Sequence, residues 1–548
     1  MTLRFVALSF LLSVPISAQI QQPGTPPSFR GGHLLPLYAP SVVLPAPDVG
    51  RLLQEDEARN NWPLRYGAVI PTAFSCETTG RWDELPSGEL VWRLRILSPG
   101  ARSLGVFFDQ YDLAPSGELY LYDPGRGTVL GAFTRATRQP NGALTVQPLL
   151  GDQIVIEYVQ AKDDAFRPTL RIGEVVHDYR GILDQVEVES PQSLLAGCLV
   201  DVNCPAGANY QDIKRSVIVV IAGGVLCSAG LLTNTAHDGT PFFLTANHCG
   251  NMTNVVAIFN YENAVCGVSG ASQSQTVSGA TLLAASNTYD SQLYRLSSAP
   301  PAAYQAFFAG WDRGTRQPKP AISLSHPNGL PKKIARDDDA PVQSGFDYRV
   351  TWEMGKLEPG SSGSPLFNGE KRVIGPACCV SDFNCRSQWA NYGRFGGFYD
   401  QRSLGRWLDP LGTDPVSANG FDPYHGQAFA YNGSGANLEI YRSVTPPSLG
   451  TTWVAEVDTS AVPFSTTTTI LGYRQPLAGV FVPQGELLVD IGLPLLFSSF
   501  APSVGGLAAH SNALPNNAAL IGFVSYTQAV IQAPAPVILT NGLELHLR

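Results

Sequence analysis

The cysteines of this chain are concentrated in one segment, and this distribution constrains the fold more than any other feature. Eight of the nine cysteines lie between Cys198 and Cys385, Cys76 stands alone before them, and none follows Cys385. Disulfides crosslink exported domains, whereas structural zinc sites need Cys and His ligands at short, regular spacing. The only adjacent cysteines, Cys378 and Cys379, have no histidine at such a spacing. The sequence therefore predicts one disulfide-stabilised domain between parts without crosslinks, and no metal site.

The first 18 residues have the pattern of a secretory signal peptide. Arg4 precedes an apolar run from Phe5 to Ile16, and Ala18 ends a small-residue cleavage site. The run is too short to span a bilayer, and Pro15 interrupts it near its end. No later stretch reaches the ~20 unbroken apolar residues of a membrane helix. We therefore expect no membrane span and a secreted protein, extracellular or held at the bacterial cell surface.

The composition favours short strands and tight turns over long amphipathic helices. The chain contains 54 Gly and 43 Pro, and only 15 % of its residues are charged. The predicted fold class is therefore mainly β. A net charge of -9, with only 36 Lys and Arg, provides no basic surface for a phosphate backbone, so we expect no nucleic-acid partner.

At 548 residues the chain is too long for a single hydrophobic core. Alternating runs in the first half predict an N-terminal β-sandwich. Its place between signal peptide and cysteine-rich segment suggests a propeptide, with an ordinary accessory domain as the alternative. The last 125 or so residues contain no Cys and no Lys and predict a second β-sandwich, an accessory domain. The predicted division is signal peptide 1–18, Pro-rich segment 19–60, β-sandwich 61–180, linker 181–192, cysteine-rich domain 193–423 and C-terminal β-sandwich 424–548.

A glycine-flanked serine is the strongest local sign of chemistry. The segment Glu358 to Pro365 reads Glu-Pro-Gly-Ser-Ser-Gly-Ser-Pro and precedes an apolar run. Glycines allow a tight turn that exposes one hydroxyl and directs neighbouring backbone N–H groups at one point. Ser362 is the candidate nucleophile, and the N–H groups of Gly360 and Ser362 are the candidate oxyanion hole. A plain loop is the alternative reading of such a string.

A serine nucleophile needs a neighbouring base, and His248 is the candidate. It directly follows the apolar strand-like run Phe242 to Ala246 and precedes Cys249, which could fix its loop. A hydrogen-bonded surface or core histidine is the alternative.

The third expected group is a carboxylate that orients the histidine. Asp290 lies between His248 and Ser362 in the chain and begins a strand-like run. The competing candidates are Asp238, Asp312 and Asp382. Each of these could instead be a solvated carboxylate in a turn.

These residues resemble the lysyl endopeptidase branch of the trypsin-like serine proteases, which bacteria secrete. The resemblance covers residues 193–423 and implies a chymotrypsin-like double β-barrel with the triad in the cleft between the barrels. The blocks that carry it are Cys198-x5-Cys204-Pro, Leu244-Thr245-Ala246-x-His248-Cys249-Gly250, Asp290-x-x-Leu293-x-x-Leu296, Ala309 to Arg313, His326-Pro327-Asn328, Glu358 to Pro365, Lys371 to Gly375, Tyr392-Gly393-Arg394 and Trp407 to Pro410.

The resemblance also implies three disulfides, and it leaves Cys76, Cys378 and Cys379 without partners. The implied pairs are Cys198 with Cys385, Cys204 with Cys266, and Cys227 with Cys249.

The substrate pocket departs from the family pattern. Family members read lysine with an aspartate two residues before the Tyr-Gly-Arg block, and here that place holds Ala390. Ala377, Cys378 and Cys379 lie on the strand that would line the pocket, where the family has a histidine or an aromatic followed by glycine. Lys356, six residues before the nucleophile, would lie near the pocket floor and favour an acidic substrate residue, or else would point into solvent. Strict lysine specificity is therefore not expected.

The expected maturation site also argues against strict lysine specificity. Similarity places the mature N-terminus near Ser193, yet no Lys or Arg lies between Gly181 and Ile213. A strictly lysine-specific enzyme could not release itself there, so the specificity differs, another protease cuts, or the propeptide stays attached.

The predicted function is a secreted serine endopeptidase, made as a zymogen, that acts on proteins or peptides without a cofactor. Esterase activity of the same triad stays open. The competing prediction is a catalytically degenerate, protease-like binding or adhesion protein. In either case the C-terminal domain is a candidate for binding a surface or a secretion partner.

Overall fold

A computed structural model describes residues 24–30, 39–59, 62–183, 198–381, 388–462, 464–533 and 537–548. The chain forms two compact units, one of Met1–Tyr304 with Phe308–Ala418 and one of Gln305–Phe307 with Asn419–Arg548. The predicted signal peptide, the predicted mature start at Ser193, and Cys385 and Asp382 lie outside the described residues. Strands dominate the described part, as the Gly- and Pro-rich composition predicted.

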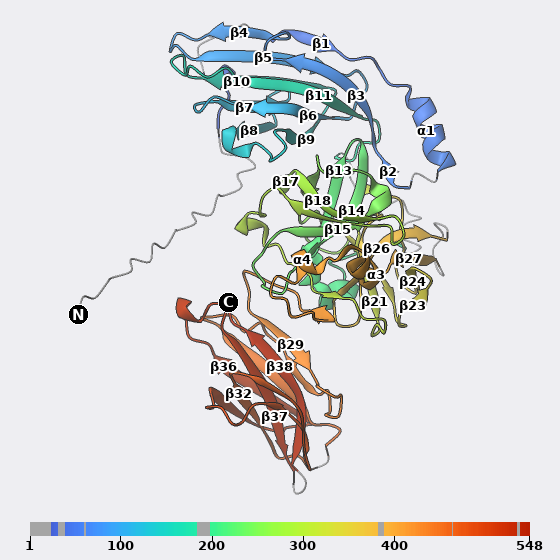
Figure 1. The fold of residues 1–548 in the computed structure, drawn as a ribbon, viewed down its shortest axis with the longest axis vertical. Coiled ribbons are helices and arrows are strands. Elements are labelled where there is room, and N and C mark those ends of the chain that lie inside the picture. The colour runs from blue at the N-terminus through green and yellow to red at the C-terminus, as the bar shows by residue number, and fades with distance from the viewer. Residues whose placement is uncertain are drawn as a thin grey trace, which may run out of the picture. The chain divides into compact units, whose positions relative to one another are not determined.

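The predicted N-terminal sandwich consists of two sheets that lie in layers (Figure 1). One sheet has the order β1-β5-β10-β7-β8, with β4 paired to β5, and the other has the order β3-β11-β6-β9. Their facing sides bury one apolar cluster that includes Trp92, Phe108, Tyr111 and Tyr158, which is the main driving force for a sandwich. The strands are β1 Ser41–Val43, β3 Gly67–Ser75, β4 Arg81–Glu84, β5 Leu90–Leu97, β6 Ser103–Asp112, β7 Glu118–Tyr122, β8 Val129–Phe133, β9 Leu144–Leu150, β10 Gln153–Gln160 and β11 Thr169–Asp178.

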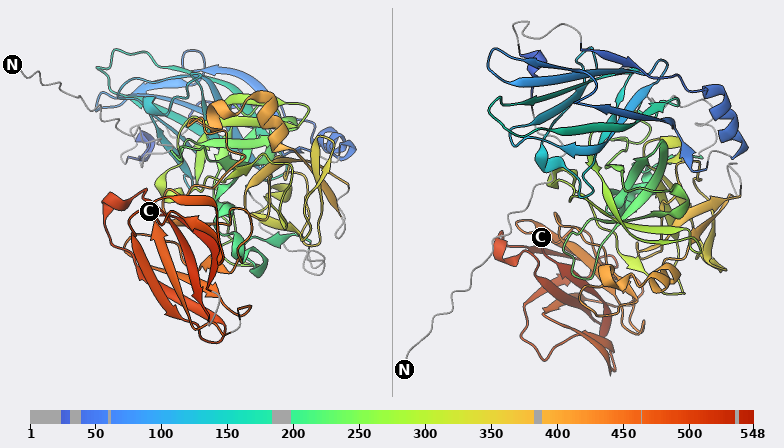
Figure 2. Two further views of the ribbon diagram at one scale, coloured as in Figure 1. Left: turned by 60° about the horizontal axis from the view of Figure 1, so that its bottom comes forward. Right: turned by 45° about the horizontal axis from the view of Figure 1, so that its top comes forward.

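The segment that sequence reasoning described only as Pro-rich contributes ordered elements. It contains β1 and the helix α1, Val49–Ala58, which lies outside both layers of the sandwich (Figures 1 and 2). The Asp48 side chain accepts a hydrogen bond from Arg51 N and caps the helix. Leu52 and Asp56 are the buried residues of the helix. A short helix with one buried face is difficult to predict from the sequence when its apolar residues show no clear helical period.

The protease-like part contains the two extended sheets expected for a double barrel. The first has the order β17-β16-β13-β14-β15-β19-β18, and the second has the order β12-β22-β21-β25-β26-β27-β24-β23, with β20 and β28 at its side. The strands of the first are β13 Val217–Ala222, β14 Val225–Leu232, β15 Phe242–Ala246, β16 Val256–Ile258, β17 Thr276–Ser278, β18 Ala280–Ser286 and β19 Ser291–Leu296. The strands of the second are β12 Val200–Asp201, β20 Trp311–Asp312, β21 Ala321–Ser325, β22 Lys333–Asp337, β23 Val342–Ser344, β24 Asp347–Thr351, β25 Pro365–Phe367, β26 Val373–Val380, β27 Trp389–Gly393 and β28 Ser417–Ala418.

A strand from the N-terminal part joins the first barrel sheet. Strand β2, Leu64–Arg65, pairs antiparallel with β14, with Leu64 opposite Leu226 and Arg65 opposite Val225. The N–H groups of Tyr66 and Gly67 both donate to the Gly224 carbonyl. Leu64 and Tyr66 belong to the same buried cluster as Leu226 and other residues of the first barrel. The predicted sandwich boundary at 61 therefore cuts close to a strand that belongs to the barrel sheet.

Helices are few and short in the residues that the structure describes. Besides α1, the structure has α3 Phe395–Arg402, which ends at a left-handed Ser403, and α4 Gly405–Leu408. Within the described ranges, none of the helices has the length and the apolar sequence that a membrane crossing requires.

The C-terminal unit is a second β structure. Its sheets have the orders β29-β38-β37-β32-β35, β30-β31-β36 and β33-β34, and Trp453, Ile470 and Leu543 lie in its apolar core. Its strands are β29 Gln427–Tyr431, β30 Tyr441–Ser443, β31 Thr452–Asp458, β32 Thr467–Tyr473, β33 Pro476–Val482, β34 Gly485–Val489, β35 Phe497–Pro502, β36 Leu507–Ala513, β37 Val524–Gln532 and β38 Ile538–His546. The mainly β fold class is confirmed throughout, whereas the domain boundaries and the propeptide role stay predictions.

Candidate active site

His248 and Asp290 are brought together by two neighbouring strands of the first barrel. Strand β15 is buried along its whole length and ends at Ala246, opposite Ser291 at the start of β19. His248 follows in a short 3-10 turn, and Asp290 directly precedes β19. The pairing of the two strands therefore places both side chains at the same end of the sheet.

The contact between the two residues has two hydrogen bonds. His248 N donates to Asp290 Oδ1 at 2.9 Å, and the ring Nδ1 lies 2.5 Å from Asp290 Oδ2. Asp290 has a φ of 43°, in the left-handed region that Asp tolerates better than most residues. The Cys227–Cys249 disulfide fixes the histidine turn to β14. A carboxylate on Nδ1 leaves Nε2 as the nitrogen that can take a proton from a nucleophile.

The competing carboxylates have other structural roles. Asp238 Oδ1 accepts hydrogen bonds from the backbone and hydroxyl of Thr240. Asp312 Oδ1 accepts from Gly314 N at 2.7 Å. Neither hydrogen bonds with His248 in the described part of the chain, whereas Asp290 does.

The serine turn belongs to the second barrel but is attached to the first. Ser228 N on β14 donates to the Ser362 carbonyl at 2.8 Å, and Ser228 Oγ donates to the Gly360 carbonyl at 2.9 Å. Gly363 has a φ of 79°, and a Cβ there would lie 2.1 Å from Thr245 Oγ1. The turn therefore packs against β15 three residues before His248, which only glycine permits.

Ser362 Oγ and His248 Nε2 are both buried, and neither has a hydrogen-bond partner among the described residues. The second hydrogen bond of a triad is thus absent from this state of the chain. Catalytic hydrogen bonds are often long in unliganded enzymes and tighten only when substrate binds.

The candidate oxyanion hole has free donors. Gly360 has a φ of 95°, and a Cβ there would lie 2.7 Å from the His326 carbonyl. In the part of the chain that the structure describes, the N–H groups of Gly360 and Ser362 donate to no backbone carbonyl, unlike those of Ser361, Gly363 and Ser364. Two unsatisfied N–H groups beside a serine hydroxyl are the donor set that a developing oxyanion needs.

Lys356 neither points into solvent nor presents an uncompensated charge. It forms an ion pair with Glu358, and each side chain is only 13 % exposed. Burial raises the pKa of Glu358 even though Lys356 opposes that shift. Between them, Leu357 exchanges two hydrogen bonds with the side chain of Gln388, at 2.7 and 2.9 Å. The lysine charge is therefore neutralised within the chain.

The remaining predicted pocket residues lie on two paired strands. Ala377, Cys378 and Cys379 are on β26 and Ala390 is on β27, with Val380 opposite Ala390. Ala377 and Ala390 are fully buried, whereas both cysteines are partly exposed and free. A register shift between Ala377 and Cys379 marks a bulge at Cys378.

Of the implied disulfides, Cys204–Cys266 and Cys227–Cys249 are present. Cys198 is disulfide-bonded, and its implied partner Cys385 lies outside the described residues. Cys76 is buried and free. Disulfides of this kind fit an oxidising compartment.

One group of carboxylates has the spacing of a cation site. Oxygens of Asp337, Asp339 and Glu353 lie within 4.8 Å of one another. Asp337 accepts hydrogen bonds from the N–H groups of Asp339 and Thr351, and Glu353 accepts one from Asp338. These hydrogen bonds explain why the three carboxylates lie close together: they hold the backbone of a loop.

Sequence reasoning missed Trp62, which lies against the candidate site. Its indole Nε1 donates to the Cys378 carbonyl at 2.7 Å, and its ring stacks on that of His248 with centroids 6.2 Å apart and planes at 25°. The only sequence signal is a large aromatic residue in a polar stretch just before a proline. That signal is weak because no local pattern connects residue 62 with residues 248 and 378.

One family model and several solved structures are similar to the protease-like segment. A family described as "Lysyl endopeptidase, C-terminal domain" matches residues 195–391. Similar solved structures include Rv3671c from M. tuberculosis as an inactive-form mutant (14 % identity, 39 % of this chain and 94 % of that chain, TM-score 0.27). Others are the inactivated protease paralogue S-D1 of the scabies mite (10 %, 38 % and 96 %, TM-score 0.27) and a Glu endopeptidase in complex with MPD (12 %, 35 % and 91 %, TM-score 0.26). Residues 195–391 are therefore similar to the C-terminal domain of lysyl endopeptidase, and this segment contains His248, Asp290 and Ser362.

Proposed function

We propose that the chain is a secreted serine endopeptidase, made as a zymogen, whose catalytic groups are Ser362, His248 and Asp290. The observation that carries this proposal is the His248–Asp290 pair with its two hydrogen bonds. The Ser362 turn packs through Gly363 against strand β15, which leads to His248.

In the proposed reaction Ser362 Oγ attacks the peptide carbonyl and its proton passes to His248 Nε2. Asp290 holds the Nδ1 proton and stabilises the imidazolium. The N–H groups of Gly360 and Ser362 stabilise the oxyanion. The imidazolium then gives its proton to the leaving amine, and an acyl-enzyme remains. Water hydrolyses the acyl-enzyme by the same steps in reverse order, with His248 again as the base.

Strict preference for lysine is not part of the proposal. Ala390 is buried and offers no carboxylate, and Glu358 is already paired with Lys356. A substrate ammonium would find no carboxylate at position 390, and the loss of that counter-charge removes much of the discrimination in favour of lysine.

A fluorophosphonate probe tests the proposal. It should label the full chain, or the form found in the culture medium, at Ser362, and Ser362→Ala should abolish labelling. Ser344→Ala is the matched control, because Ser344 is exposed on β23, and it should leave labelling unchanged. Absence of labelling in every folded form would refute the enzyme and favour the degenerate binding protein.

A further inference from the structure

Trp62 contacts two parts of the candidate site, the ring of His248 and the carbonyl of Cys378. One edge of its indole is hydrogen-bonded to the Cys378 carbonyl, and one face is stacked on His248. The candidate nucleophile is also shielded from solvent, since Ser362 Oγ is buried and has no hydrogen-bond partner among the described residues. An incoming substrate has to displace this tryptophan.

The Cys378 carbonyl is a natural acceptor for an extended peptide. Ala377, the preceding residue, exchanges hydrogen bonds with the serine turn: Gly363 N donates to the Ala377 carbonyl, and Ala377 N donates to the Ser364 carbonyl, both at 2.9 Å. Cys378 is the next residue along β26 after the one bonded to the serine turn, and its carbonyl could accept an N–H group from a peptide that adds to the strand. Trp62 takes that acceptor with a side-chain N–H.

The indole lies between an apolar cluster and the polar His248–Asp290 pair. Trp62 packs against the buried core of the second barrel, a cluster that includes Trp352, Leu357, Ala377 and Ala390. The nearest charged residues along the serine turn, Lys356 and Glu358, are paired with each other. An apolar wall with a single acceptor is suited to a large aromatic side chain and poorly suited to an isolated charge.

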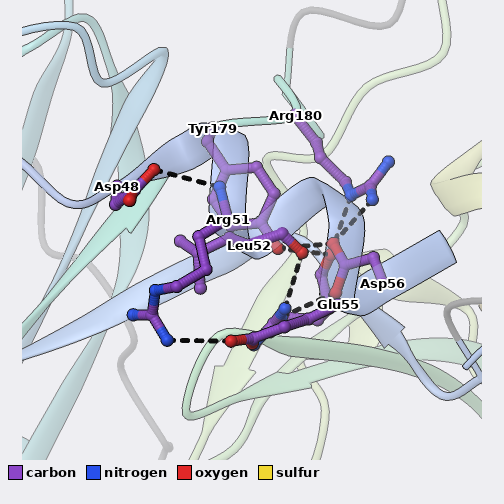
Figure 3. Close-up of polar contacts among 8 residues, drawn as sticks. Asp48, Arg51, Leu52, Glu55, Asp56, Tyr179 and Arg180 are labelled. Carbon is purple, nitrogen blue, oxygen red and sulfur yellow. Dashed lines mark hydrogen bonds and ion pairs between the residues drawn. The ribbon is translucent and has the colours of Figure 1, made fainter. Parts of the chain in front are cut away.

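Anchors on both sides of Trp62 hold it at this place. Before it, α1 ends in a network in which Asp56, only 3 % exposed, accepts hydrogen bonds from Tyr179, Arg180 and Arg65 at 2.6–2.7 Å (Figure 3). After it, strand β2 pairs with β14 of the first barrel. A side chain held between two such anchors loses little further entropy on docking, so the contact with the site is favoured over a free segment.

We propose that this apolar site is the substrate side-chain site next to the scissile bond, that it takes aromatic residues, and that Trp62 fills it as a tethered mimic until displaced. The substrate class rests on the proposed function above. The site itself, as a place that binds an indole, does not depend on catalysis.

Full-chain variants test both parts. Trp62→Ala should bind N-acetyltryptophanamide, followed by the NMR signals of that probe, whereas the unmodified chain should not. The same variant should be labelled at Ser362 at least about tenfold faster, because a mimic that covers the site in most molecules lowers the reactive fraction accordingly. In a peptide library it should cut after Trp, Tyr or Phe.

Two further variants serve as controls. Trp62→Phe keeps an aromatic ring and should stay slow to label. Trp82→Ala removes a partly exposed tryptophan that contacts Tyr158 and Cys76 in the sandwich, and it should behave as the unmodified chain. Both are checked for folding by near-UV circular dichroism.

The outcomes separate the two proposals. Ser362-dependent labelling together with cuts after Lys or Glu would overturn the aromatic site and leave the endopeptidase intact. Failure of Trp62→Ala to bind the indole probe would overturn the site directly. Indole binding without any labelling would support the site and refute the enzyme.

Discussion

The substitution Glu262→Gln should strongly destabilise the protease-like part, because this carboxylate neutralises two lysines that are almost inaccessible to water. Glu262 forms ion pairs with Lys214 at 2.6 Å and with Lys332 at 3.3 Å, and Lys332 is 0 % exposed. Burial opposes the charge of Glu262, but the two lysines outweigh burial and lower its pKa from 4.5 to about 2. Burial likewise lowers the pKa of Lys332, and Glu262 limits that shift.

The expected loss follows from these values. A folded pKa of about 2 against 4.5 in the unfolded chain corresponds to about 3 kcal/mol of stability from ionised Glu262. Removing one partner of a buried ion pair costs about 3–5 kcal/mol in measured cases. Both estimates agree on roughly 3 kcal/mol, which is about a 100-fold change in the opening equilibrium.

The pH dependence has a defined sign. A carboxylate whose pKa is lowered by folding stabilises the protein above its unfolded pKa, and this contribution disappears as the pH falls through the folded value. The unmodified chain should therefore lose stability between pH 4.5 and about 2. Glu262→Gln should lack this part of the acid transition.

Hydrogen exchange of the full chain is the appropriate assay, since it reports β16 and β22, on either side of the ion pairs, separately from the other domains. Rates are corrected for intrinsic exchange at each pH. Glu370→Gln, which removes a carboxylate that is 53 % exposed, should change little. An opening free energy of Glu262→Gln within about 1 kcal/mol of the unmodified chain at pH 7 would refute the electrostatic argument.

Two other predictions concern groups around the candidate site. Iodoacetamide should alkylate Cys379 before Cys378, because a hydrogen bond from the Cys378 thiol lowers the pKa of Cys379 and the same bond raises that of Cys378. Peptide mapping during a pH titration checks this, and equal rates at both thiols would contradict it. Asp56→Asn should weaken the attachment of α1 by about 2 kcal/mol through the loss of charge-assisted hydrogen bonds from Arg65 and Arg180. It should speed both exchange around Tyr66 and labelling of Ser362, whereas Glu57→Gln on the exposed face of the same helix should do neither.

Several parts of this protein follow from the sequence alone. Apolar alternation and turn residues predict strands because side chains in a sheet alternate between its faces. The blocks around His248, Asp290 and Ser362 keep a fixed chain order, so they were recognisable before any coordinates. Two disulfides were implied by the same resemblance.

Only the tertiary structure decided what surrounds these residues. The charge of Lys356 looked free in the sequence, and the fold pairs it with Glu358. Helix α1 and strand β2 have no clear apolar period in the sequence. Their stability comes instead from tertiary contacts, the Asp56 network for α1 and the pairing with β14 for β2. The contact of Trp62 with His248 and Cys378 spans 186 and 316 positions. Contacts between such distant positions arise from packing and leave no local pattern in the chain, so only the tertiary structure shows Trp62 beside His248 and Cys378.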